Sequence, residues 1–392
     1  MKFFNRVKNF AFLSVIIGLH GLIIPVIAQT TSILTAGLNK PTKLITAPDN
    51  SLLVAESGTF TPNSGRISIV NRRTGARRTL IDGLPSGVNN LGGPPEVAGP
   101  SGLVLQGNIV YLTISVGDAV QNTGGPGIES PNPNPSSPLF DSVLQLNFSG
   151  NYAKVSSPFV LSTADHTALA NGDEVTLTNA DGQKLTLRMV VNLPDYVSNP
   201  TPMLPDNVRS SNLYGIETFR KNLYVVDASR NLVYQVNAAS GEYDIFTVFA
   251  NKPNPLFPNL GGPFVEAVPD NIHRVGNQLL VPLLTGFPFV AGLSEVRTVS
   301  LKNGLNETFI PNLTSAIDVS AAGENSYYTL EFSANQLANQ PGRIKYFASP
   351  EAAPVTVVAN LISPTSMVLD GDSGDIFVTE IFTGRIIRVS SF

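Results

Sequence analysis

The sequence predicts an all-β protein, a six-bladed β-propeller, and three observations lead to this class. A unit of four short, β-rich segments recurs along the chain. Glycine and proline, 33 and 30 of 392 residues, are spread through the chain, as turns between many short strands require. Charged residues make up 14% of the chain, against about 25% in a typical globular protein, and hydrophobic residues make up 42%. This composition indicates a sizeable core and excludes a long-helix or wholly disordered protein.

The repeating unit is clearest in its first and last copies. The first copy begins at Pro41 and the last at Pro364, and both contain a strand-like run that ends in Glu followed by a Gly-Arg-Ile segment. The copies offer four short strands, or three in the last copy, bounded by Gly, Asn, Asp or Pro, which is the pattern of a propeller blade. The six copies begin at positions 41, 100, 212, 269, 315 and 364.

The two ends of the chain complement each other. The last copy stops after three strands, near Val389, and residues 32–38 resemble the fourth strands at 79–84 and 356–361. We therefore predict that the N-terminal strand completes the last blade, so that residues 29–392 form one closed domain without an exposed sheet edge. An open sandwich or two separate β-domains are the alternatives.

Residues 1–28 have the pattern of a secretory signal peptide. A basic start at Lys2, Arg6 and Lys8 precedes an apolar run, and Val26 and Ala28 are the small residues that precede a cleavage site. A membrane anchor is the alternative. We expect an exported protein, periplasmic or extracellular, with no membrane span after cleavage.

Charge and cysteine content exclude several function classes. Without residues 1–28 the chain carries 22 basic and 29 acidic side chains and no basic stripe, so nucleic acid is not an expected partner. The chain has no cysteine, which excludes zinc fingers, thiol catalysis and disulfides.

Extra length falls in loops that a propeller would place on one face. The longest insertion, about 163–211, contains two alternating segments around the turn 179–182, which predicts a hairpin and a flap over the channel. Loops gathered on one rim are typical of a binding surface, although simple drift in loop length is the alternative.

The residue that ends each second strand gives the candidate site. Four of these six positions are acidic, and in a propeller they would approach the axis. One interpretation is a Ca²⁺ site made by Glu56, Asp227, Glu331 and Glu380. Another is a carboxyl pair that shares a proton for acid–base catalysis, with Glu331 and Glu380 as candidates. The third is structural, with each acid capping backbone N–H groups.

Histidines and aromatic residues complete the candidates. His273 lies in the inner strand of the fourth unit, where it is a candidate catalytic group or a packed side chain, and His166 is expected to be solvated. Aromatic rim residues could stack on a flat apolar ligand. The predicted ligand-binding residues are Glu56, Ser115, Tyr214, Asp227, Phe287, Phe289, Glu331 and Glu380.

Several segments together resemble the ScyD/ScyE family. They include Ala55-Glu56-Ser57-Gly58, Pro100-Ser101-Gly102-Leu103, Leu284-Thr285-Gly286-Phe287-Pro288-Phe289 and Val378-Thr379-Glu380-Ile381-Phe382-Thr383-Gly384-Arg385. The family's members are exported propellers, chiefly cyanobacterial, associated with scytonemin, an aromatic indole–phenol pigment. The resemblance covers nearly all of the chain after residue 28 and implies a propeller outside the cytoplasmic membrane, but no particular reaction.

Three functions remain open at this point. The first is binding of a small aromatic molecule or an extracytoplasmic protein on the insertion-bearing face, with Ca²⁺ as a possible organising ion, in extracytoplasmic pigment metabolism. The second is a metal-dependent propeller enzyme, a lactonase-like hydrolase or a phenol-coupling catalyst, that uses the channel carboxylates. The third is a protein-interaction scaffold with an empty channel.

Overall fold

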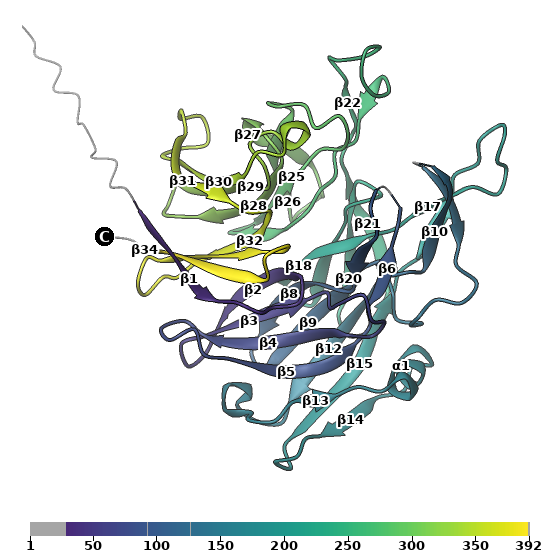
Figure 1. Ribbon diagram of the computed structural model, residues 1–392, viewed down its shortest axis with the longest axis vertical. Helices are drawn as coiled ribbons and strands as arrows, with labels where there is room; N and C mark the ends of the chain where they lie inside the picture. The colour runs from purple at the N-terminus through teal and green to yellow at the C-terminus, as the bar shows by residue number, and fades with distance from the viewer. Residues whose placement is uncertain (1–28, 92, 126, 391–392) are drawn as a thin grey trace, which may run out of the picture.

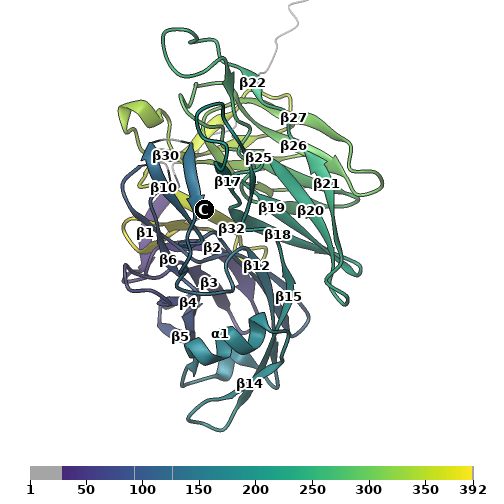
Figure 2. The same ribbon diagram turned by 90° about the vertical axis from the view of Figure 1, so that its right-hand side faces the viewer.

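The computed structural model describes residues 29–91, 93–125 and 127–390, and the predicted signal peptide lies outside these ranges. The fold is all-β and of the β-propeller type (Figures 1 and 2). Within the described ranges, six sheets of four or five strands correspond to the repeated units of the sequence, and their strands pair antiparallel except for β13 (Phe159–Val160) with β5 (Arg77–Leu84).

The first three sheets contain the following strands. Sheet one has β2 (Pro41–Ala47), β3 (Ser51–Glu56), β4 (Gly65–Asn71), β5 (Arg77–Leu84) and β13 (Phe159–Val160). Sheet two has β8 (Pro100–Gln106), β9 (Ile109–Ile114), β12 (Ser142–Phe148), β15 (Lys184–Asn192) and β14 (Val175–Thr178). Sheet three has β18 (Leu213–Phe219), β19 (Asn222–Asp227), β20 (Leu232–Asn237) and β21 (Tyr243–Val248).

The last three sheets have four strands each. Sheet four has β24 (His273–Val275), β25 (Gln278–Leu283), β26 (Ser294–Ser300) and β27 (Asn306–Leu313). Sheet five has β28 (Ala316–Ala321), β29 (Tyr327–Glu331), β30 (Gly342–Phe347) and β31 (Val355–Leu361). Sheet six has β32 (Pro364–Leu369), β33 (Ile376–Glu380), β34 (Arg385–Ser390) and β1 (Thr30–Thr35).

Burial explains why the second strand of each sheet reads as a continuous apolar run. All six residues of β3 are buried, whereas the fourth strand β5 contains buried, half-buried and exposed residues. A strand that is covered on both faces needs apolar side chains on both, while an outer strand needs them on one face only. The runs Leu52-Leu53-Val54-Ala55 and Ile376-Phe377-Val378 therefore belong to second strands.

The first strands of successive sheets contact one another, from β2 through β8, β18, β24 and β28 to β32, and β32 contacts β2. Hydroxyl groups join them: Thr42 Oγ1 donates to Pro100 O at 2.9 Å, Ser101 Oγ to Leu213 O at 2.8 Å, and Thr365 Oγ1 to Pro41 O at 2.9 Å. A register shift recurs at the start of five first strands, at Pro41/Lys43, Pro100/Leu103, Leu213/Ile216, Ala316/Asp318 and Pro364/Ser366. Such bulges change the direction of the side chains that follow, which lets the first strands pack closely together where they meet, at the axis of the fold.

The two ends of the chain are paired. β1 runs antiparallel to β34, with Thr30 opposite Ser390 and Ile33 opposite Ile387. Figure 1 shows the purple β1 beside the yellow strands of sheet six. The N-terminal strand thus covers the edge of β34 that would otherwise be exposed.

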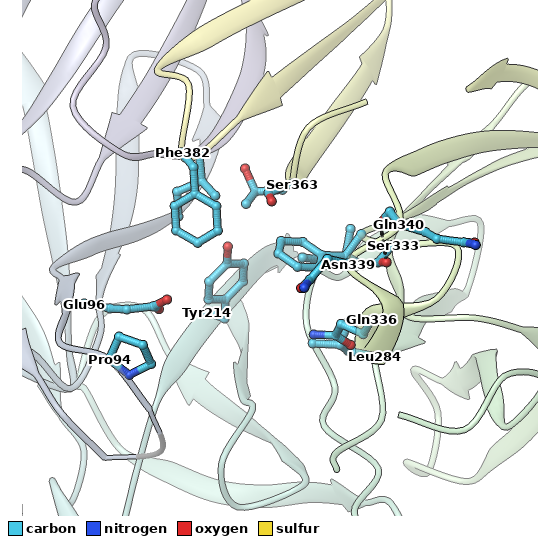
Figure 3. A pocket seen from close by; sticks show the side chains of 14 residues that line it. Pro94, Glu96, Tyr214, Leu284, Ser333, Gln336, Asn339, Gln340, Ser363 and Phe382 are labelled. Carbon is cyan, nitrogen blue, oxygen red and sulfur yellow. Dashed lines mark hydrogen bonds between the residues drawn. The ribbon is translucent and has the colours of Figure 1, made fainter. Parts of the chain in front are cut away.

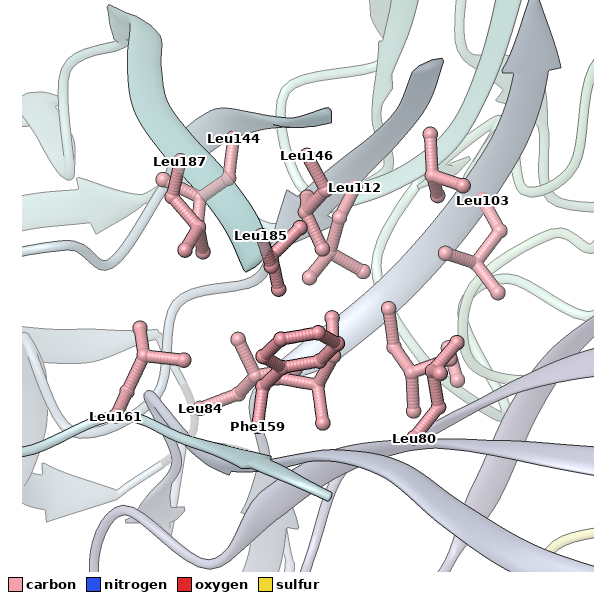
Figure 4. Close-up of a cluster of buried hydrophobic side chains, with 14 of the residues drawn as sticks. Leu80, Leu84, Leu103, Leu112, Leu144, Leu146, Phe159, Leu161, Leu185 and Leu187 are labelled. Carbon is pink, nitrogen blue, oxygen red and sulfur yellow. The ribbon is translucent and has the colours of Figure 1, made fainter. Parts of the chain in front are cut away.

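The insertion predicted for 163–211 forms a hairpin, but on the outside of the molecule rather than over the channel. β14 and β15 pair around the turn at Asn179, and β15 is itself the fourth strand of sheet two. Helix α1 (Thr163–Ala170) and β13 cover the outer edges of sheets one and two. Leu161, Leu185 and Leu187 complete the hydrophobic core between them (Figure 4).

The prediction that His166 is solvated was wrong. Its side chain is 1% exposed, because α1 turns it toward sheet one. The imidazole bonds to Ser137 Oγ at 3.1 Å and to Gly83 O at 2.8 Å. Burial lowers the pKa of His166, so the neutral ring is a structural bridge in this core.

Rim elements complete the fold. A small four-stranded sheet contains β10 (Val120–Gly125), β11 (Ile128–Pro131), β16 (Tyr196–Ser198) and β17 (Val208–Ser210), and two short hairpins contain β6 (Gly87–Asn89) with β7 (Glu96–Ala98) and β22 (Lys252–Pro253) with β23 (Phe264–Val265). Two 3-10 turns span Tyr152–Lys154 and Gln336–Ala338. Within the described ranges, no helix has the length and apolarity needed to cross a bilayer.

Candidate ligand-binding site

A cavity of about 660 Å³ opens where the first strands begin. Its floor comes from three of these strands, through Tyr214 of β18, Ile317 of β28 and Thr365 of β32. Its walls come from rim loops, among them the β6–β7 hairpin, the segment after β29 and the segment after β33. Residues far apart in sequence therefore share one cavity (Figure 3).

The neighbouring strands hold the backbone of Tyr214 in place. Its carbonyl accepts a hydrogen bond from Thr113 Oγ1 at 2.7 Å. The flanking strands approach so closely that a Cβ on Gly215 would lie 2.7 Å from Asp270 O, and one on Gly102 would lie 2.2 Å from Tyr214 O. Glycine at 102 and 215 is thus what lets the backbone of β18 sit between its neighbours.

The Tyr214 hydroxyl points into the cavity toward Phe382 (Figure 3). Among the described residues it has no hydrogen-bond partner, although the ring is only partly exposed. Removal from bulk water, together with the negative charges of Asp270, Asp318 and Glu96, raises the pKa of Tyr214 well above its usual range. The phenol is therefore neutral and available to donate or accept a hydrogen bond.

Two further aromatic rings and three amides line the same cavity. Phe332 is partly buried against the core of sheets five and six, while Phe382 is 53% exposed, with Lys40 Nζ 4.4 Å from its ring centroid. Gln336, Asn339 and Gln340 come from the segment between β29 and β30. Three rings with neutral amides can hold a flat apolar molecule and hydrogen-bond its polar atoms.

A charged cluster lies below the cavity floor. Two of its residues, Asp318 and Ser366, directly follow the floor residues Ile317 and Thr365 in sequence. Lys43 Nζ lies 3.6 Å from Asp318 Oδ2 and donates to Asn271 Oδ1 at 2.8 Å. His273 Nε2 bonds to Asp318 Oδ1 at 2.5 Å. Ser366 Oγ and the Met367 N–H also donate to Asp318, at 3.0 and 2.8 Å.

The charges of this cluster compensate one another. Burial alone would raise the pKa of Asp318, but Lys43 and His273 lower it to about 2, so the carboxylate stays ionised. Burial and the charge of Asp318 raise the pKa of neighbouring Asp270 well above its usual range, and Lys43 offsets this only in part. The cluster links sheets one, four, five and six at the axis.

The acids predicted to converge on the axis do not do so. Glu56, Asp227, Glu331 and Glu380 end second strands, which lie one strand away from the axis. Each accepts a backbone N–H from just before the first strand of its own sheet; the donors are Asn39, Asn212, Thr314 and Ile362. The structural interpretation, in which each acid caps backbone N–H groups, is the one the geometry matches.

Basic side chains occupy most of the remaining carboxylate oxygens. Arg66 pairs with Glu56 at 2.7 Å, Lys345 with Glu331 at 2.7 Å, and Arg385 with Glu380 at 3.0 Å. In the part of the chain that the structure describes, no three or more His, Asp or Glu side chains are grouped as ligands for a metal ion. The four acids from which a Ca²⁺ site was expected, Glu56, Asp227, Glu331 and Glu380, lie in four separate caps, three of them ion-paired.

The other predicted residues divide between the cavity and the rim. Tyr214 lines the cavity, whereas Ser115 is buried in the backbone network of sheet two, where its N–H donates to Gly99 O at 2.8 Å. Phe287 and Phe289 lie outside the cavity lining and pack edge to face, with centroids 6.0 Å apart. His273 lies at the axis, but Asp318 and Lys43 engage its Nε2.

Sequence reasoning missed Lys43 and Asp318. Aligning the third residue of the first strands would have found them, because five of the six strands have Lys43, Gly102, Gly215, Asp318 and Ser366 at this position. The other aligned residues are small, so a lysine and an aspartate at this position indicate a buried ion pair.

Comparison with known proteins supports the fold alone. No family model and no curated protein matches the chain. A crystal structure from Thermus thermophilus, provisionally described as an oxidoreductase (glucose dehydrogenase), has a TM-score of 0.50 and 14% identity over 92% of this chain and 99% of that one. An auxiliary nutrient binding protein from Bacteroides thetaiotaomicron has a TM-score of 0.48 and 10% identity over 90% and 69% of the two chains. The first of these places the chain among proteins of β-propeller type.

Proposed function

We propose that the chain is a six-bladed propeller, closed by β1, that binds a small, flat aromatic molecule carrying a hydrogen-bonding group in the cavity above Tyr214. The unpartnered Tyr214 hydroxyl, directed into a cavity with two further aromatic rings, is the observation that carries this proposal. The cyclic contacts of the first strands and the β1–β34 pairing support the six-bladed arrangement.

The chemistry of the walls selects the ligand class. Phe332, Phe382 and the Tyr214 ring favour a planar apolar body, and the amides favour neutral hydroxyl, carbonyl or ring N–H groups. An indole or phenol has these features. This ligand class agrees with the resemblance to the ScyD/ScyE family. We therefore propose that this protein is exported and acts in pigment metabolism outside the cytoplasmic membrane.

Binding is the function that the geometry favours over catalysis by the channel carboxylates. Glu331 and Glu380 are engaged by backbone N–H groups and by Lys345, Arg343 and Arg385. Neither lines the cavity.

Titration with 5-hydroxyindole tests the proposal directly. The protein has no tryptophan, so the emission of the probe can be followed without an indole background from the protein. We expect saturable binding and a weaker response to cyclohexanol, which has a hydroxyl group but no aromatic ring. Tyr214→Phe should weaken binding about three- to tenfold, the effect of one lost hydrogen bond.

Two phenylalanine variants provide the matched comparison. Phe382→Ala should weaken binding about tenfold, because it removes an aromatic contact and apolar area. Phe264→Ala changes an exposed ring in β23 that lies outside the cavity lining and should leave binding unchanged. Equal effects of the two variants, or no saturable binding by the unchanged protein, would show that the cavity is not the site.

A further inference from the structure

A second cavity, of about 510 Å³, lies at the other end of β18 from Tyr214. Phe219 and Arg220 line it where β18 turns into β19, Asn277 and Gln278 where β24 turns into β25, and Lys302 after β26. These three turns belong to the adjacent sheets three and four. The cavity is thus formed by neighbouring turns on the face opposite the aromatic site.

Cations gather around one aromatic ring at this cavity. Arg220 Cζ lies 5.0 Å and Arg274 Cζ 5.5 Å from the Phe219 ring centroid. Lys302 adds a third positive charge from the β26–β27 turn. The whole chain has a formal net charge of −4, so this positively charged cluster is opposite in sign to the net charge of the protein.

These cations have no acidic partner. Among the described residues, Arg220, Arg274 and Lys302 form no ion pair with a carboxylate. The nearby carboxylate of Glu217 accepts the backbone N–H groups of Thr218 at 2.7 Å and Arg274 at 3.0 Å. Its oxygens thus bind backbone N–H groups, and it forms no ion pair with the guanidinium groups.

We propose that this cavity binds an acidic saccharide, a sugar that carries a carboxylate group. Guanidinium groups match carboxylates in geometry and charge. The amides of Asn277 and Gln278 and the Ser300 hydroxyl suit sugar hydroxyls, and Phe219 and Leu301 offer an apolar surface to the ring carbons. This site does not depend on the aromatic site proposed above.

Calorimetric titration with trigalacturonate, with neutral maltotriose as the matched probe, tests this inference. We expect saturable binding of trigalacturonate that weakens as salt is added, since exposed charges are screened. Maltotriose should bind at least tenfold more weakly. The double change Arg220→Ala with Lys302→Gln should weaken trigalacturonate binding at least tenfold and leave 5-hydroxyindole binding unchanged.

The control is Arg73→Ala, which removes an exposed arginine from the β4–β5 turn, away from this cavity. Melting temperatures of all variants establish that they fold. Equal loss in Arg73→Ala and in the double variant would overturn the site, because net charge alone would then explain binding. Inorganic sulfate that binds as tightly as trigalacturonate would overturn the saccharide class, and absence of binding by the unchanged protein would overturn both.

Discussion

Lys43→Met is expected to destabilise the protein by about 3–5 kcal/mol, the cost of removing one partner from a buried ion pair. Lys43 and Asp318 have side chains only 4% and 0% exposed, and their pair joins sheets one and five. Without the lysine, the buried Asp318 carboxylate loses the ammonium group 3.6 Å away and keeps His273, Ser366 and the Met367 N–H as partners. Urea unfolding measures the change in the free energy of unfolding.

A pair on the rim gives the comparison. Arg209 and Glu266 form an ion pair at 2.6 Å with side chains 30% and 43% exposed, so Arg209→Met should cost less than about 1 kcal/mol. Replacing both axial partners, Lys43→Met with Asp318→Leu, should recover part of the loss, because no buried charge then lacks its partner. If Lys43→Met costs no more than Arg209→Met, the axial cluster does not hold the sheets together.

Asp141→Asn is expected to stabilise the protein at alkaline pH and to change little at pH 4. Asp141 is fully buried, its Oδ1 accepts the Leu213 N–H at 3.3 Å, and its Oδ2 has no hydrogen-bond partner. Burial, followed by the charges of Asp227 and Asp195, raises its pKa well above the usual range, and the Leu213 N–H and Arg230 offset this only in part.

The sign of the pH dependence follows from this raised pKa. The carboxyl is protonated in the folded state but ionises at about its ordinary pKa, near pH 4, when the chain is unfolded. Its contribution to stability is therefore fully present below pH 4 and is lost as the pH rises toward the folded pKa. Each tenfold difference in the ionisation constant between the folded and unfolded states corresponds to about 1.4 kcal/mol of stability that is lost as the pH rises. Asp141→Asn has no carboxyl group to ionise at this position and does not lose this stability.

Urea unfolding of both proteins between pH 4 and pH 9 checks this expectation. The difference in stability between Asp141→Asn and the unchanged protein should grow as the pH rises. Asp181→Asn serves as the opposite control, because hydrogen bonds from Ser156 and Ser157 lower the pKa of that exposed carboxyl. A constant difference across this pH range for Asp141→Asn would contradict a raised pKa at this position.

The repeat in the sequence predicted the strands well. Copies read from positions 41, 100 and 364 begin at the first residues of β2, β8 and β32, because proline starts each of these strands. The fourth strand of the second copy was not recognised. It lies inside the segment 163–211, where the chain first adds α1 and β14 before it returns to the sheet as β15.

The charged cluster below the cavity was harder to predict, because strands far apart in the sequence must pack together to bring its residues into contact. Lys43 and Asp318 are 275 positions apart, and only the packing of the first strands against one another brings them together. The acids at the ends of second strands suggested a shared site because they recur, yet four sheets use them for the same backbone cap. Repetition alone does not separate a repeated structural role from a shared site.

The most direct test of the ring is a crosslink between the chain ends. The sequence has no cysteine, so Thr30→Cys with Ser390→Cys introduces a single pair, at directly opposed positions of β1 and β34. Directly opposed residues of antiparallel strands lie within the Cα separation that a disulfide spans. Mild oxidation should give a monomer with no free thiol and a higher melting temperature than its reduced form, whereas free thiols or disulfide-linked dimers would contradict the closure by β1.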